Sequence, residues 1–204
     1  AFIRAGVPHV VVGDTAFYTR KEIKDVVAYL RVLQNPRDTV SLQRIINTPP
    51  RKIGPTTVDK LQAWAESLPW EDGMPVPLGL ALFRRAWANS PSANGNAPVE
   101  YEDDHLDAML IPAAKDMGFG SAKAGYRSVE EFVTMMQKLR DAMPHSNPGE
   151  LIQQMVKATG FEGYVTDQEN GDERWAFVKE LIAIAKDPAP VLDVEGIAWD
   201  EESN

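Results

Sequence analysis

Histidine and acidic side chains are the residue types that bind metals and transfer protons. The three histidines, His9, His105 and His145, lie far apart in the sequence, and none has another histidine four residues away. That spacing would place two ligands on one face of a helix. His105 lies among Asp103, Asp104 and Asp107, a group that fits either a metal cluster or a solvated acidic face.

Nucleophiles and phosphate-binding loops are the next candidates. The chain has no cysteine, no G-x-S-x-G turn for an activated serine, and no G-x-x-x-x-G-K-[ST] phosphate loop. The glycines from Gly118 to Gly125 miss the G-x-G-x-x-G spacing of a dinucleotide site and follow no strand pattern, so we interpret them as a turn. The residues alone therefore predict no active site.

The turn from Thr48 to Thr57 is the segment best suited to bind a ligand. Gly54 and Pro55 begin a helix there, where free backbone N–H groups and the helix dipole favour an anion such as phosphate. Arg51 and Lys52 in the turn and Lys60 in the helix add positive charge. We expect both turn cations in solvent and expect Gly54 to be required by a close turn. An ordinary helix connection with solvated bases is the alternative.

Composition and charge restrict the class of protein. The 204 residues are 44% hydrophobic and 25% charged, with no apolar run long enough to cross a bilayer. Residues 1–64 hold ten basic and five acidic side chains, whereas residues 65–204 hold 11 basic and 25 acidic ones. If the chain contacts a phosphate backbone, its first third does so. Because it starts on neither methionine nor a signal peptide, we expect a fragment of a longer protein.

Hydrophobic spacing predicts mostly helices. A short strand is expected at 7–13, and a helix is expected from a capping box at Thr19 and Glu22 to Asn35. Asp38 should cap a second helix that Pro49 ends, and Pro55 should begin a third. Later helices are expected at 78–87, after a capping box at Ser128 and Glu131, from Asn147 to Gly160, and from Asp172 to Ala185.

Three motifs together resemble the UvrD/Rep/PcrA family of superfamily 1A DNA helicases. They are F-x-x-R-x-E-I-K-D with A-Y-L-R in residues 17–31, N-P-x-D with S-L in 35–42, and R-I-I-N-x-P with I-G in 44–54. Their order is unbroken. Later, Glu173-Arg174-Trp175, Val178 and Glu180-Leu181 resemble the late 2B helix of the family, especially of its Srs2-like eukaryotic members.

The resemblance implies a mainly α fold: a helical 2B-type domain with a helix-hairpin-helix, plus a short strand and helix from the edge of an α/β motor domain. Residues 1–35 would be that edge of domain 2A, and 36–188 would be the 2B domain with a long loop at about 89–104. Residues 189–204 would form an acidic, disordered tail. ATP and Mg²⁺ would bind elsewhere in the parent helicase, and the fragment would hold no cofactor.

In the family, the 2B hairpin contacts duplex DNA ahead of a single-strand junction, and 2B swivels to regulate unwinding. The resemblance assigns this contact to residues of the turn and of the helix start that follows it, and the charge argument adds Lys60. The predicted DNA-binding residues are Thr48, Arg51, Lys52, Ile53, Gly54, Thr56, Thr57 and Lys60. Many relatives have glycine where this chain has Lys52. Lysine is less permissive of turn geometry than glycine but can pair with a phosphate.

The first motif also supplies charged residues at the 2A edge, namely Arg20, Glu22, Lys24 and Asp25. They either shape domain 2A near the single-stranded track, or Arg20 and Glu22 form a structural pair at a helix start. The five tryptophans allow a base-stacking role, but Trp175 lies on an apolar helical face and is expected in the core.

Two functions follow. The first is a duplex-DNA-contacting, regulatory domain of an ATP-dependent 3′-to-5′ DNA helicase in repair, recombination or replication, inactive alone as an ATPase. The second is a protein-interaction or autoinhibitory module without direct DNA contact, in which the acidic residues 65–204 dock on a basic partner. Expected partners are DNA, the rest of the helicase chain and regulatory proteins, without a membrane. The location is cytoplasmic in a bacterium and nuclear in a eukaryote. An independent small-molecule enzyme would need a polar constellation that the sequence lacks.

Overall fold

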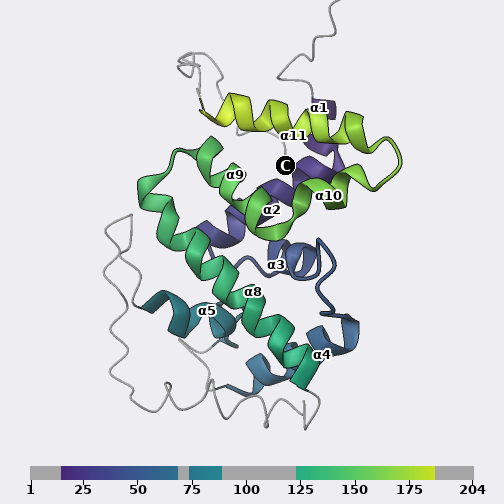
Figure 1. Ribbon diagram of the computed structural model, residues 1–204. Coiled ribbons are helices and arrows are strands. Elements are labelled where there is room, and N and C mark those ends of the chain that lie inside the picture. Colours follow the sequence, from purple (N-terminus) through teal and green to yellow (C-terminus); the bar gives the residue numbers. More distant parts are fainter. Residues whose placement is uncertain (1–14, 69–73, 89–122, 187–204) are drawn as a thin grey trace, which may run out of the picture.

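A computed structural model describes residues 15–68, 74–88 and 123–186. These residues form helices and no β-strand (Figure 1), which confirms the mainly α fold. The elements are α1 (Thr15–Thr19), α2 (Lys21–Gln34), α3 (Thr39–Ile45), α4 (Pro55–Ser67), α5 (Leu78–Ala88), α8 (Lys123–Ala142), the 3₁₀ helix η2 (Met143–His145), α9 (Pro148–Thr159), α10 (Phe161–Thr166) and α11 (Gly171–Lys186). The strand expected at 7–13, the loop at 89–104 and the tail at 189–204 lie outside the described residues.

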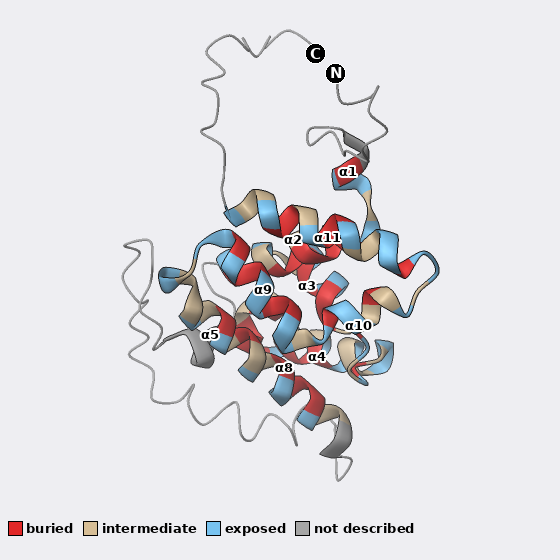
Figure 2. Ribbon diagram, turned by 45° about the horizontal axis from the view of Figure 1, so that its top comes forward, coloured by how far each residue is buried: buried red, intermediate tan, exposed pale blue. Residues whose placement is uncertain are grey.

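Helix α2 is the central element. Ile23, Val26, Tyr29 and Leu33 recur at helical spacing and are fully buried. The helix packs on α3, α8, α9 and α11. Figure 2 shows that buried residues gather on the sides of these helices that face one another. The predicted capping box is wrong, because Arg20 occupies the N-cap without a side-chain hydrogen bond.

The predicted starts of two other helices are confirmed. Asp38 accepts hydrogen bonds from the backbone N–H and the hydroxyl of Ser41, which lowers the pKa of its carboxyl. Asn147 and Glu150 form a complete capping box at α9. Gly160 ends α9 in the left-handed region, at φ 67°.

The helix starts at Ser128 and Asp172 differ from prediction. Helix α8 already begins at Lys123, so Ser128 lies inside it and is buried, and Glu131 pairs with Arg127 instead of forming a cap. Helix α11 begins at Gly171, so Asp172 lies in its first turn. The short α10 follows Gly160 without a linker, and its six residues are too few to give a clear periodic pattern.

One hydrophobic core contains buried residues from the α-helices that the structure describes. It contains buried residues on both sides of the predicted domain boundary at residue 35, and that boundary stays a prediction. The rings of Phe17 and Phe177 meet edge to face at 6.3 Å between centroids, joining α1 to α11. Trp175 is half-buried and packs against this core, as its place on an apolar helical face predicts, although it is not fully buried.

Candidate nucleic-acid interface

The segment from Ile46 to Gly54, called the turn below, joins α3 to α4. Its middle is attached to α2 through Tyr29, whose ring is fully buried. The Tyr29 hydroxyl donates a hydrogen bond of 2.6 Å to the carbonyl oxygen of Thr48 and accepts one from the Arg51 guanidinium. Burial raises the pKa of Tyr29 to about 12, although the nearby guanidinium acts in the opposite direction.

Arg51 points into the protein instead of into solvent, which corrects the expectation of a free side chain. Its Nη1 donates to the carbonyl oxygen of Ile45 at 2.9 Å, at the end of α3. The last carbonyls of a helix have no partner within the helix and favour a cation. The guanidinium also lies 5.4 Å from the ring centroid of Phe132 on α8. Arg51 therefore connects the turn to three helices.

Asn47 and Ile53 fix the backbone of the turn. The Asn47 side-chain oxygen accepts hydrogen bonds from the backbone N–H groups of Arg51, at 2.7 Å, and Ile53, at 3.2 Å. Ile53 is 1% exposed and inserts into the core. Tyr29 and Asn47 were not among the predicted site residues, although both belong to the motifs that carry the resemblance.

The unusual backbone of the turn is at Lys52 and not at Gly54. Lys52 has φ 64°, in the left-handed region that glycine adopts with least strain. Gly54 has φ −78° and ψ 174°, which any residue can adopt, and a Cβ there would have no atom within 4 Å. The expected need for glycine at Gly54 is therefore wrong, and Lys52 has the backbone conformation that glycine adopts with least strain.

The other side of the turn and the start of α4 face solvent. Lys52, Thr56 and Lys60 are exposed, and Thr57 is half-buried. Helix α4 begins at Pro55 without a side-chain cap and without an acidic residue in its first turn. Its N-terminus therefore combines an uncapped helix dipole with neighbouring positive charge, which is the chemistry that binds phosphate.

The charged residues of the first motif link helices to one another. Asp25 is 2% exposed and pairs with Arg44 of α3 at 2.6 Å and with Lys21 at 3.3 Å. Glu22 is buried and lies 3.7 Å from Arg174 of α11.

Arg20 lies over the ring of Phe177, 3.5 Å from its centroid. Arg20 and Glu22 therefore do not form the structural pair that was one interpretation; each contacts α11 separately. Lys24 is exposed.

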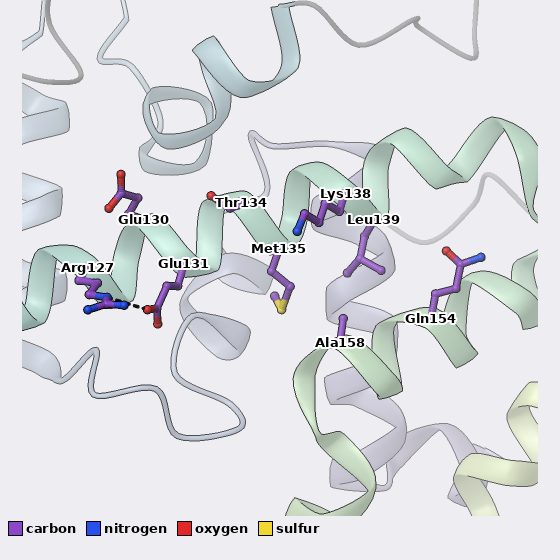
Figure 3. A pocket seen from close by; sticks show the side chains of 9 residues that line it. All are labelled: Arg127, Glu130, Glu131, Thr134, Met135, Lys138, Leu139, Gln154 and Ala158. Atoms are coloured by element: carbon purple, nitrogen blue, oxygen red, sulfur yellow. Dashed lines mark hydrogen bonds and ion pairs between the residues drawn. The ribbon is translucent and has the colours of Figure 1, made fainter.

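A hollow between α8 and α9 carries charges of both signs (Figure 3). Arg127 and Glu131 pair across one helical turn at 3.0 Å, and Lys138 lies further along the same helix. His145 is exposed on η2, whereas His9 and His105 lie outside the described residues. Within residues 15–68, 74–88 and 123–186, no three metal-binding side chains come together, and no helix is long and apolar enough to span a bilayer.

Comparison with known families defines the class of protein. The UvrD-like helicase C-terminal domain family matches residues 1–68, which include α1, α2, α3, the turn and α4. Together with the relatives below, this match shows that the chain belongs to the UvrD/PcrA-type superfamily 1A helicases, as a segment of such a protein.

One similar protein is the ATP-dependent DNA helicase UvrD1 of Mycobacterium tuberculosis. It is 33% identical over 185 residues, which cover 90% of this chain and 20% of that protein. The ATP-dependent DNA helicase PcrA of Staphylococcus epidermidis is 53% identical over 64 residues, or 31% of this chain and 9% of PcrA. PcrA of Staphylococcus aureus is 50% identical over the same length. The chain thus spans a fifth or less of these relatives.

Proposed function

We propose that this chain is the duplex-DNA-contacting and regulatory 2B segment of an ATP-dependent 3′-to-5′ DNA helicase acting in repair, recombination or replication. The turn and the start of α4 form its helix-hairpin-helix and contact the DNA backbone. ATP and Mg²⁺ bind to other parts of the parent helicase. Its partners are DNA near a single-strand junction, the rest of the helicase chain and regulatory proteins, in the bacterial cytoplasm or the eukaryotic nucleus.

The observation that carries the proposal is the division of the turn into two sides. Tyr29, Asn47 and Arg51 hold its inner side by hydrogen bonds. This leaves Lys52 and Lys60 exposed beside the uncapped N-terminus of α4. A site held in place before binding loses less entropy on binding than a mobile loop does. The DNA contacts therefore fall to Lys52, Thr56, Thr57 and Lys60, while Thr48, Arg51, Ile53 and Gly54 shape the backbone that presents them.

A titration of labelled blunt duplex with the 204-residue chain, followed by fluorescence anisotropy at several salt concentrations, tests the proposal. Each lost phosphate contact lowers the slope of log affinity against log salt by about 0.9 on duplex DNA. Lys52→Ala with Lys60→Ala should therefore reduce the slope by roughly 1.8. The bulk acidic charge of the chain makes low salt the appropriate starting condition.

The matched control replaces Arg127 and Lys138 of α8 by alanine. It removes the same formal charge from exposed positions, but outside the turn. The control should leave the slope unchanged. Equal effects of the two double variants would show that only net charge matters. Absence of duplex binding by the unmodified chain at low salt would favour a protein-interaction or autoinhibitory module instead.

A further inference from the structure

A second hollow, called the α9–α11 groove, lies between these two helices and has a volume of about 740 Å³. Helix α11 lines it with Trp175, Lys179, Ile182 and Lys186, which are spaced at i, i+4, i+7 and i+11 and so share one face. Helix α9 contributes Gln153, Val156 and Lys157 from one of its own faces. At 1.5 Å per residue, the α11 stripe runs for about 16 Å.

The packing of the two helices fixes the shape of this groove. Gly149 at the start of α9 lies against the backbone of α11, where a Cβ would collide with the carbonyl oxygen of Ile182 and the backbone nitrogen and Cγ of Lys186. The same contact holds the aliphatic stem of Lys186 beside α9. The apolar surface comes from Val156 and Ile182, which are buried, and from the half-buried ring of Trp175.

Among the described residues, three of the four charged side chains that line the groove are lysines. Lys157, Lys179 and Lys186 are exposed, and none has a carboxylate within 4 Å among the described residues. Glu162 is the one acidic residue among the described residues that line the groove. The hollow between α8 and α9 differs, because Arg127 pairs there with Glu131 and Glu130 lies nearby. The groove is therefore a local basic site on the acidic part of the chain.

We propose that the α9–α11 groove binds single-stranded DNA, with the three lysines on phosphates and the Trp175 ring against a base. A positive groove with an aromatic platform is the arrangement that holds unpaired nucleotides, whereas the bases of a duplex are stacked on one another and cannot reach a side-chain ring. This site is additional to the duplex contact of the turn. It depends on the parent acting on DNA, but not on the turn binding it.

Anisotropy of labelled oligo(dT) with the 204-residue chain, measured at several salt concentrations, tests the proposal. Lys157→Ala with Lys179→Ala should lower the salt slope by about 1.4, since each contact on a single strand contributes roughly 0.7. Trp175→Leu keeps an apolar side chain but removes the stacking ring, and should weaken binding roughly 5- to 150-fold. The same variants should keep their affinity for blunt duplex.

Two controls separate this site from the turn and from general charge. Arg127→Ala with Lys138→Ala should leave oligo(dT) binding unchanged. Lys52→Ala with Lys60→Ala should lose duplex binding and retain oligo(dT) binding, so failure of one proposal does not imply failure of the other. If Trp175→Leu lowers the melting temperature, the exposed lysine pair decides the outcome.

Three results would overturn the proposal. One is absence of oligo(dT) binding by the unmodified chain at low salt. Another is an unchanged salt slope in the Lys157 and Lys179 double variant. The third is displacement of oligo(dT) by polyglutamate of equal charge at equal concentration, which would identify an acidic protein segment as the occupant of the groove.

Discussion

Replacing Lys52 by glycine should stabilise the fold and weaken DNA binding at the same time. Lys52 has φ 64°. A residue with a Cβ in this left-handed region costs roughly 1–2 kcal/mol relative to the right-handed helical region, and glycine avoids that clash. Glycine also has more freedom to lose on folding, which offsets up to about 1 kcal/mol. The expected net gain in unfolding free energy is about 0.5–1 kcal/mol, or roughly 1–4 °C in melting temperature for a chain of this size.

Lys52→Ala is the control that separates the effect of backbone strain from the effect of losing the positive charge. Alanine loses the ammonium group as glycine does, but it keeps the Cβ that makes φ 64° unfavourable. The free energy of unfolding measured with urea should therefore be higher for the glycine variant than for the alanine variant or the unmodified chain. In duplex titrations, glycine and alanine should lower the salt slope equally, by about 0.9. A glycine variant no more stable than the alanine variant would refute the argument from backbone strain.

Three further predictions concern the inner side of the turn and the start of α3. Arg51→Met should lower the free energy of unfolding, measured with urea, by about 2–3 kcal/mol, because the Tyr29 hydroxyl and the carbonyl oxygen of Ile45 lose a charged donor. A decrease as small as that caused by replacing a surface lysine would contradict this role. The folded pKa of Tyr29, about 12, exceeds its unfolded value of 10.0. The protonated Tyr29 hydroxyl therefore contributes its full stabilisation below pH 10, and this stabilisation, on the order of 2–3 kcal/mol, is lost as pH rises towards 12. Tyr29→Phe should remove this pH dependence of the free energy of unfolding. Asp38→Ala should cost about 1 kcal/mol near neutral pH. Because the folded pKa of Asp38 is lowered below 3.8, the difference from the unmodified chain should shrink as pH falls through that folded value, whereas a constant difference would contradict the charged cap.

The helices were predictable where local chemistry alone decides them. Asn147 with Glu150 forms a box within four residues, and Pro55 cannot continue a preceding helix but fits the first helical position. The same local pattern failed at Thr19 and Ser128. The carboxylate of Glu22 lies against Arg174, which is 152 positions away in the chain, and α8 continues through Ser128. Tertiary contacts overrode capping preference in the first case.

The position of the candidate site in the sequence was predictable, but the directions of its side chains and its backbone conformation were not. Motif and charge located the turn, since both depend on residues that are adjacent in the sequence. Whether Arg51 points inward or outward depends on Tyr29, 22 positions earlier, and on the ring of Phe132. The strain at Lys52 depends on two backbone bonds to the Asn47 side chain. The α9–α11 groove requires two helices to lie side by side, so no single stretch of sequence indicated it.

The attachment of the turn to α2 has a consequence for how a 2B segment can move. Family resemblance leads us to expect that 2B swivels against 2A, and places the boundary near residue 35. A swivel at that point would separate Tyr29 from Thr48 and Arg51, and would break the pair of Asp25 with Arg44. The first change would leave the buried Tyr29 hydroxyl without its two partners, and the second would leave the buried Asp25 with Lys21 alone. Each lost hydrogen bond to a buried group costs about 1–3 kcal/mol. We therefore expect α2 and the turn to move as one body, with any swivel taking place outside these contacts.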